Sequence, residues 1–254
     1  MNSHLRADLR ERAVALRLRG LVSRWAEISE DPDLLTMVER VVAWEEHATT
    51  EHRQRRLLSG TRIKALEPVS GFDWNFPKSI RKADIIDLFS FAFLADKTNV
   101  VFLGPSGVGK TTLAQNLVHE AARAGHEARF VEAADMLDEL LAEQSRTGVE
   151  KALKRYAKPR LLAIDEVGYL SYDNRHADLL LRVIQLRHRT ASTVITTNRP
   201  FAEWREMFPN ASSVVALVDR LTENCEVMQI EGDSYRKKIS TEKRLRRGAA
   251  KTSI

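Results

Sequence analysis

The stretch FLGPSGVGKTTLA, Phe102 to Ala114, contains the motif that decides the fold. An apolar run ends where the stretch begins, and a run of helical character starts where it ends. Between them, residues 104–111 match the pattern G-x-x-x-x-G-K-[ST] in full, with the strand before it and the helix after it that the pattern requires. Such a loop turns its backbone N–H groups inward at the positive end of a helix dipole. The stretch therefore predicts a site for a nucleoside triphosphate.

Two side chains of this motif have chemical roles of their own. Lys110 can reach the β- and γ-phosphates, and the hydroxyl of Thr111 can ligate Mg²⁺. The alternative is a glycine-rich turn that binds nothing. A complete motif in the right context argues strongly against that alternative.

Two adjacent acids follow the motif. Fifty-five residues after Lys110, the apolar run LLAIDE ends in Asp165-Glu166. A carboxylate at the carboxyl end of a neighbouring parallel strand is placed to hold the magnesium shell, which makes Asp165 the second metal candidate. The next acid points differently and can orient or deprotonate a water, so Glu166 is the candidate base. The pair favours hydrolysis over a metabolite kinase, which must keep water out.

Three further polar residues are candidates for sensing the nucleotide. The run TVITTN ends in Asn198, whose amide can position the attacking water; alone it would read as a strand-end turn before Arg199-Pro200. Arg220, in VDRLTEN, is a candidate arginine finger acting on a neighbouring subunit. Arg236, in GDSYRKK, is a candidate contact to the nucleotide of its own chain. Each arginine can also be read as a surface salt-bridge residue.

The region after Asn99 alternates short apolar runs with helical patterns, which predicts a parallel sheet flanked by helices. The expected strands are residues 100–103, 128–132, 160–164, 193–197 and 226–230. The expected helices are residues 110–124, 134–144, 149–157, 175–190 and 212–223. Gly125 is a suitable C-cap for the first of these helices.

The region before the sheet reads as two helices, residues 5–30 and 34–58, each with an apolar stripe. They are followed by EPVSGFDWNFPKS, residues 67–79, whose prolines and aromatic residues indicate an ordered linker. We therefore expect a small all-α domain at 1–66, an ATPase domain at 67–235 that begins with this linker, and a basic tail at 236–254.

The composition fits a globular protein that stays in the cytoplasm. Apolar residues make up 43% and charged residues 30% of the 254 residues. No apolar stretch has the length of a membrane span, and the first twenty residues lack the apolar core of a secretory signal. The single cysteine, Cys225, cannot form an internal disulfide and lies in the apolar run CEVMQI, so we expect a buried structural thiol.

The net charge of +5 is concentrated in a few segments. Residues 235–254 hold eight Lys/Arg and one Glu, a net of +7, so residues 1–234 carry −2. Smaller basic patches lie at residues 6–24 and 53–64. Any one patch can be a solvated helix face or a solubilising end. Three of them in one chain favour a polyanionic partner, most simply nucleic acid.

The series GPSGVGKTTLA, RFVEAADMLDEL, LLAIDEVGYL, VITTNRPFAEW and DRLTENCEVMQIEGDSYR resembles the IstB-type ATPases, the transposition helper proteins of certain bacterial insertion sequences. These are related to the DnaC-type helicase loaders. The resemblance covers nearly the whole chain. It implies an AAA+ ATPase that forms a homo-oligomer on double-stranded DNA, remodels or marks a target, and stimulates a partner transposase, with no membrane involved.

The resemblance also implies roles for individual residues. Asp165 and Glu166 would serve magnesium and water, Asn198 would be the sensor, Arg220 the finger and Arg236 the second sensor. The residues implied to hold the phosphates of ATP are Gly104, Pro105, Ser106, Gly107, Val108, Gly109, Lys110, Thr111 and Thr112. A replicative helicase loader with the same ATPase core stays open as an alternative function. The tail beyond Arg236 is a DNA contact or a solubilising end.

Overall fold

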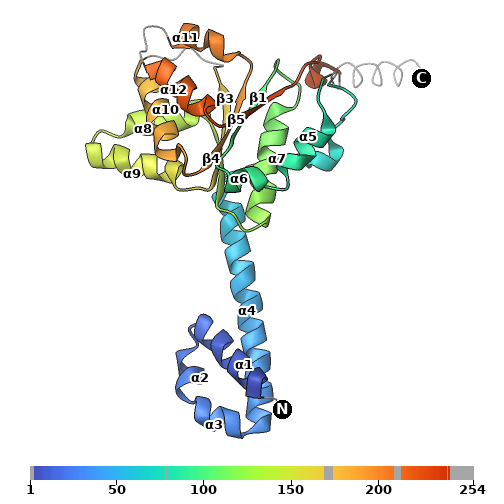
Figure 1. Ribbon diagram of the computed structural model, residues 1–254, viewed down its shortest axis with the longest axis vertical. Helices are drawn as coiled ribbons and strands as arrows, with labels where there is room; N and C mark the ends of the chain where they lie inside the picture. The colour runs from blue at the N-terminus through green and yellow to red at the C-terminus, as the bar shows by residue number, and fades with distance from the viewer. Residues whose placement is uncertain (1–2, 78, 169–173, 209–212, 239, 241–254) are drawn as a thin grey trace, which may run out of the picture. The chain divides into compact units, whose positions relative to one another are not determined.

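A five-stranded parallel sheet organises the larger part of the chain (Figure 1). The computed structural model describes residues 3–77, 79–168, 174–208, 213–238 and 240. The sheet has the order β2-β3-β4-β1-β5. Its strands are β1 (Asn99–Leu103), β2 (Ala128–Glu132), β3 (Leu161–Val167), β4 (Ser192–Thr197) and β5 (Cys225–Gln229). The five predicted strands are confirmed, with ends that differ by three residues at most.

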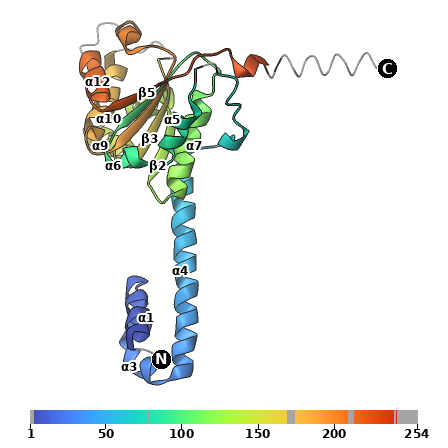
Figure 2. The same ribbon diagram turned by 45° about the vertical axis from the view of Figure 1, so that its right-hand side comes forward.

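Helices cover both faces of the sheet, as Figures 1 and 2 show. One face carries α8 (Ala133–Ala142), α9 (Arg146–Ala157), α10 (Asn174–Arg187) and α12 (Ser213–Thr222); the other carries α5 (Lys82–Leu88), α6 (Ala92–Ala95) and α7 (Lys110–Arg123). Neighbouring strand residues alternate between the two cores: Val101 belongs to the first, whereas Val100 and Phe102 belong to the second. A parallel sheet buried on both faces explains why its strands read as continuous apolar runs.

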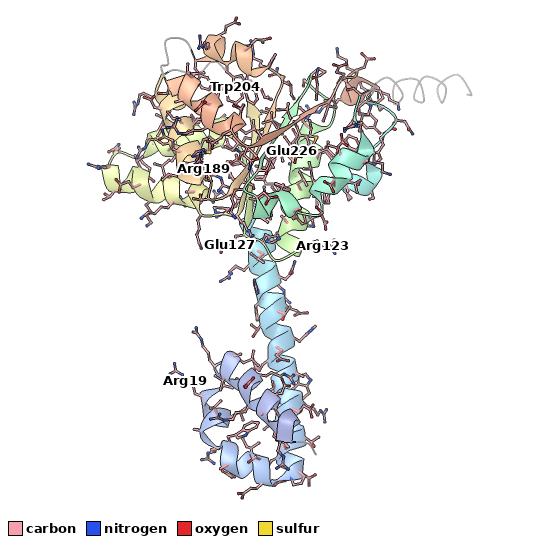
Figure 3. The ribbon with its side chains drawn as sticks, viewed as in Figure 1. Arg19, Arg123, Glu127, Arg189, Trp204 and Glu226 are labelled. Atoms are coloured by element: carbon pink, nitrogen blue, oxygen red, sulfur yellow. The ribbon has the colours of Figure 1, made fainter. Side chains whose placement is uncertain are left out.

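The helices predicted after the phosphate-binding motif are confirmed to within three residues at each end. Gly125 ends α7 as expected: its φ is +91°, and its N–H donates to the carbonyl of Ala122. The sequence analysis did not predict α5 and α6, nor three further short helical segments. They are η1 (Val69–Gly71), η2 (Phe201–Glu203) and α11 (Trp204–Met207). Trp204, labelled in Figure 3, is fully buried and donates its indole N–H to the carbonyl of Arg199.

Strand β5 lies at one edge of the sheet, and this changes the expectation for Cys225. The thiol is half-buried and not fully buried, because an edge strand has a neighbour on one side alone. It packs against the core that contains α8 to α12. Burial, and then the charge of Glu226, raises the pKa of the thiol to about 12, which disfavours the thiolate form.

The described residues up to Gly60 form four helices: α1 (Ser3–Ala15), α2 (Arg19–Ser23), α3 (Trp25–Glu30) and α4 (Pro32–Gly60). The single predicted helix at 5–30 is therefore wrong. Arg17 adopts a left-handed φ of 59°, and Leu18 donates its N–H to the carbonyl of Ala13, which ends α1. This break lets leucines that would lie on one straight helix fold back over a shared core. The prediction of a second helix at 34–58 is confirmed.

A small core holds these four helices together. Its buried residues are Leu9, Ala13, Ile28, Leu35, Val38 and Val42. At its border, Arg12 donates two hydrogen bonds, of 2.8 and 2.7 Å, to the carboxylate of Glu46 on α4. Asp31 caps α4 by accepting the N–H groups of Asp33 and Leu34, and Pro32 takes the first helical position.

The chain divides into two compact units, residues 1–56 and 57–254. The domain limits expected from the sequence, at residues 66 and 235, stay a prediction. Most of the basic tail, residues 241–254, lies outside the described residues. We find no helix among the described residues that is both long and apolar enough to cross a membrane.

Candidate functional site

The loop between β1 and α7, which we call the phosphate loop (residues 104–109), closely approaches the segment that follows β5. A Cβ on Gly104 would come within 2.1 Å of the carbonyl oxygen of Ile230, and one on Gly107 within 2.3 Å of the Ser234 hydroxyl. Gly107 and Gly109 also have left-handed φ values, +85° and +100°. A side chain at Gly104 or Gly107 would clash with the segment after β5, and one at Gly107 or Gly109 would strain the left-handed backbone. Glycine is therefore the residue that fits at each of these positions. The structure thus gives a steric reason for the spacing of the glycines in the motif.

Lys110 opens α7 and points back over the phosphate loop. Its Nζ donates to the carbonyls of Gly104 at 2.7 Å and Pro105 at 2.8 Å. Burial lowers the pKa of Lys110, while the nearby charges of Asp165 and Glu166 raise it. An ammonium held at the loop by two neutral carbonyls is well placed to bind an anion there.

Asp165 is buried near the end of β3 and forms a network of hydroxyl contacts. Its carboxylate accepts the hydroxyl of Thr111, at 2.9 and 3.1 Å to the two oxygens, and the hydroxyl of Thr196 on β4. Burial raises the pKa of Asp165, and these hydrogen bonds oppose the increase. The structure therefore brings together the two residues that the sequence offers as magnesium ligands.

Glu166 points differently from its neighbour because the backbone changes direction there. Its φ is 58°, and the pairing of β3 with β4 is interrupted between Ile164 and Val167. The N–H of Glu166 donates to Thr196 Oγ1 at 2.9 Å, and its exposed side chain lines the pocket beside the phosphate loop. Burial, followed by the charges of Asp165 and Glu132, raises the pKa of the Glu166 carboxyl. A carboxylate of raised pKa facing this pocket suits a general base.

The remaining predicted residues divide into two groups. Asn198, directly after β4, and Arg236, after β5, both line the pocket together with residues 106–112. Arg236 is close enough to affect the pKa values of Lys110 and Glu166. Arg220 does not line it; it lies in the last turn of α12 and donates to the carbonyl of Ala216 at 3.2 Å. The structure brings Asn198 and Arg236 to the site of their own chain, but not Arg220.

The sequence analysis missed one wall of this pocket, which has a volume of about 1140 Å³. The wall consists of residues 65–68, 71–73, 76 and 77, and we call it the linker wall. Asn116, which is buried on α7, fixes it in place: it accepts the N–H of Val69 at 2.9 Å and donates to the carbonyls of Glu67 and Thr112, each at 2.8 Å. One satisfied amide therefore joins the linker to the helix of the phosphate loop.

A second contact, which we call the clasp, closes the linker wall against the segment after β5. The N–H of Tyr235 donates to the carbonyl of Gly107 at 2.9 Å. The Tyr235 ring packs edge to face against the Phe76 ring, with centroids 5.2 Å apart. Lys238 pairs with Asp73 at 3.0 Å and lies over both rings, 4.9 and 5.5 Å from their centroids. The aromatic cluster FDWNF is the sequence feature that could have indicated this contact, but nothing in the sequence places Tyr235 beside it.

The known family described as IstB-like ATP binding protein matches residues 11–243, which includes every residue of the pocket. The chain belongs to this IstB-like family. The pocket between the phosphate loop and the linker wall is the candidate ATP site, because residues 106–112, which include most of the phosphate-binding motif, line it.

Curated relatives of this IstB-like chain come from bacterial insertion sequences. It is 37% identical over 205 residues to a protein of Bacillus thuringiensis subsp. berliner described as an ATP-binding protein of insertion sequence IS232, covering 80% of this chain and 82% of the relative. It is 30% identical over 236 residues to the corresponding protein of insertion sequence IS5376 from Geobacillus stearothermophilus, covering 90% and 94%.

Solved structures resemble the larger unit of the IstB-like chain in fold. DnaI aligns with a TM-score of 0.55 and 18% identity over 69% of this chain and 93% of its own. AMPPCP-bound DnaA from Aquifex aeolicus aligns with a TM-score of 0.51 and 20% identity over 68% and 56%. With the parallel sheet and the phosphate loop, these alignments identify the fold as that of an AAA+ P-loop ATPase.

The donor atoms at the end of β3 fit a magnesium ion held jointly by protein and nucleotide. The hydroxyl of Thr111 and the carboxylate of Asp165 are hard oxygen ligands in mutual contact. Among the residues that the structure describes, no cluster of three or more His, Cys, Asp or Glu side chains could hold a metal alone. The two oxygen donors of Thr111 and Asp165 fit Mg²⁺, which takes one or two protein ligands together with phosphate oxygens and water.

Proposed function

We propose that this IstB-like ATPase is a transposition helper, which assembles on double-stranded DNA, remodels or marks a target site and stimulates the transposase of its own element. ATP hydrolysis would drive its disassembly. The observation that carries the proposal is a site built for hydrolysis, with Glu166 facing the pocket, in a chain whose relatives are insertion-sequence proteins. The DNA of such elements lies in the bacterial cytoplasm, where we place the protein.

The proposed chemistry uses the contacts of the site directly. The phosphate loop, Lys110 and Arg236 bind the phosphates, and the linker wall and the ring of Tyr235 receive the base. Thr111 and Asp165 would hold a magnesium ion, which would supply neutralisation of phosphate charge. Glu166 accepts a proton from the attacking water, and Asn198 orients that water. A nucleotide bound against the linker wall would displace bulk water, which strengthens each of these electrostatic contacts.

The position of Arg220 supports a site shared between subunits. It is half-buried in the last turn of α12 and does not line the pocket of its own chain. In a head-to-tail assembly, an arginine on one subunit can complete the nucleotide site of the next. The nucleotide would then join neighbouring copies, and hydrolysis would weaken the contact.

The distribution of exposed arginines and lysines supports contact with DNA phosphates. In the first unit, Arg10, Arg17, Arg19 and Arg24 are exposed, as are Arg53 and Arg55 on α4. Arg62 and Lys64 are exposed in the second unit. Basic groups without a recognition motif predict binding that depends on phosphates more than on base sequence.

The test is binding of the full-length protein to duplexes of unrelated sequence, with ATP, with ADP, and across a series of salt concentrations. We expect ATP-dependent binding that weakens steeply with salt and shows little sequence preference, and electron microscopy should show an oligomer on the duplex. Addition of the transposase encoded beside the gene should then increase strand transfer. Preference for single-stranded DNA, together with capture of a replicative helicase ring, would replace this proposal with the helicase-loader function.

A further inference from the structure

Thr196, on β4, has a side chain that contacts both acids of the pocket. The residue is buried, with 1% of its surface exposed. Its hydroxyl donates to the carboxylate of Asp165 and accepts the backbone N–H of Glu166, the latter at 2.9 Å. One oxygen atom therefore joins the residue that would hold magnesium to the residue that would activate water.

The contact with Glu166 lies at an irregularity of the sheet. The register shifts between Ile164 and Val167, so that two residues of β3, Asp165 and Glu166, stand opposite Thr196 alone. Such a bulge interrupts the backbone ladder and re-aims a side chain. The left-handed φ of Glu166, 58°, costs free energy and persists only where the surroundings hold it. The Thr196 hydroxyl is one of these surroundings, because it accepts the N–H at the bulge.

The contact with Asp165 holds the carboxylate from the side of the sheet. Asp165 is 3% exposed and also accepts the hydroxyl of Thr111, which is itself a candidate magnesium ligand. Carboxylates that bind metal ions depend on hydrogen-bond partners of this kind for their orientation. Threonine suits the task because its branched Cβ restricts χ1 and so fixes the direction of the hydroxyl.

We propose that Thr196 is a positioning residue for ATP hydrolysis. Its hydroxyl holds the Asp165 carboxylate beside Thr111 and, at the same time, holds the Glu166 backbone in the conformation that turns this side chain to the pocket. The inference rests on the roles proposed above for the two acids. It adds that β4 aligns them as a pair before nucleotide binds.

Removal of the hydroxyl with little change of shape is the direct test. Thr196→Val should lower the maximal rate of ATP hydrolysis by about tenfold to a hundredfold, and Thr196→Ser, which keeps the hydroxyl, should recover most of the loss. Thr193→Val is the matched control: it removes another buried hydroxyl of β4, one that accepts the Arg187 guanidinium at 3.0 Å and does not line the pocket. This control should keep the wild-type rate. Equal losses in the two valine variants, or no recovery with serine, would overturn the proposal.

Nucleotide binding gives a readout that is separate from turnover. Each variant is titrated with ATP in a calorimeter, with and without Mg²⁺. Without Mg²⁺, Thr196→Val should bind ATP as the wild type does, because the phosphate loop is intact. On addition of Mg²⁺ it should gain about tenfold less affinity than the wild type. An unchanged gain, or equal weakening under both conditions, would contradict a role through Asp165.

Hydrogen exchange tests the contact with Glu166 in the absence of nucleotide and metal. The Glu166 N–H should exchange slowly in the wild type and in Thr196→Ser, and about tenfold faster in Thr196→Val. Wild-type exchange at the rate of an unprotected amide would refute the contact, whether or not the valine variant folds.

Glu166→Gln, assayed alongside, separates this inference from the proposed function. If Glu166→Gln hydrolyses ATP at the wild-type rate, the proposed role of Glu166 fails, and the positioning role that acts through it fails as well. If Glu166→Gln is slow while Thr196→Val is as fast as the wild type, the positioning role of Thr196 alone is refuted.

Discussion

The two sides of the ATP pocket are built in different ways. The phosphate loop and Lys110 form one continuous segment whose geometry comes from local backbone angles and a helix start. The linker wall and the clasp, in contrast, join residues 65–77 to residues 235–238, which lie more than 150 positions apart in the sequence. A site made of one segment can be read from a motif. A site made by packing two distant segments has no such signature.

The two sides also differ in what holds them. The phosphate side is held by backbone conformation and by buried hydroxyl contacts to Asp165. The linker side depends on one buried amide, Asn116, and on a half-exposed ion pair between Asp73 and Lys238. We therefore expect changes on the phosphate side to affect the chemistry strongly, and changes on the linker side to affect nucleotide affinity by smaller factors.

The largest expected effect is on turnover. Glu166→Gln removes the proposed base but keeps the shape of the side chain, so the rate of ATP hydrolysis should fall by about 10²–10⁴-fold. The affinity for ATP should change little, because the phosphate loop is intact. Phosphate release and nucleotide binding measured on the same sample test this. Turnover near the wild-type rate would remove Glu166 from the proposed role.

The next effect concerns the binding of phosphates. Lys110→Ala removes the charged donor at the phosphate loop, and we expect the affinity for ATP to fall by about tenfold to a hundredfold. Inorganic tripolyphosphate should lose affinity by a similar factor, since it shares the phosphates. Calorimetric titration with both ligands is the measurement. Undiminished ATP affinity would contradict the assignment of this side of the pocket.

The matching change on the linker side is Asn116→Ala. It leaves the N–H of Val69 and the carbonyl of Glu67 without their partner, so the free energy of unfolding should fall by about 1–3 kcal/mol. Affinity for ATP should fall by about tenfold with the loosened wall, while that for tripolyphosphate stays nearly constant. Glu120→Ala, on the same helix but outside the pocket, is the control. Equal losses for both ligands would show that the two sides are not separable.

A smaller effect is expected at the clasp. Lys238→Ala removes the ion pair with Asp73 and the contact with the Phe76 and Tyr235 rings. A half-exposed ion pair is weak, so ATP affinity should fall by about two- to fivefold. Lys237→Ala, one residue away and exposed, is the matched control. If the two variants bind ATP equally well, the clasp has no part in holding the nucleotide.

The smallest effect is a shift of the pH profile. The raised pKa of Glu166 means that it takes up a proton at a higher pH than an ordinary glutamate, and activity should therefore decline on the acid side earlier than usual. Glu132→Gln removes one charge that raises this pKa, so the acid limb should move to lower pH. Glu127→Gln, a surface acid paired with Lys158, should leave the limb in place. If Glu132→Gln leaves the pH of the acid limb unchanged, a group other than Glu166 controls the loss of activity at low pH.

Much of the second unit could be predicted because its signals are local. The strands were identified from apolar runs, and the glycines of the phosphate loop from their spacing. Arg187 shows the limit of such reasoning. It lies on α10 in a pattern that reads as a surface arginine, yet it is buried and donates to the carbonyls of Tyr156, Pro159 and Ser192 among others. Burial lowers its pKa to about 9. The local sequence cannot predict the burial of a side chain whose hydrogen-bond partners are carbonyls of distant segments.

The first unit shows a second limit. The apolar residues between Leu9 and Trp25 fit one long helix by periodicity, but three helices allow more of them to reach the same small core. The left-handed backbone at Arg17 costs free energy at one residue. Burial of apolar side chains from several helices in the shared core provides the stabilising free energy. Periodicity describes a helix face and says nothing of where the helix bends.

The sequence by itself determined the parallel sheet, the phosphate loop, the acid pair and the family, because each of these is written within a short continuous stretch. The tertiary structure decided the linker wall, the clasp, the central position of Asn116, and the separation of Arg220 from the pocket of its own chain. The physical reason is the same in each case: these features depend on which distant segments pack together, and packing is a property of the whole fold.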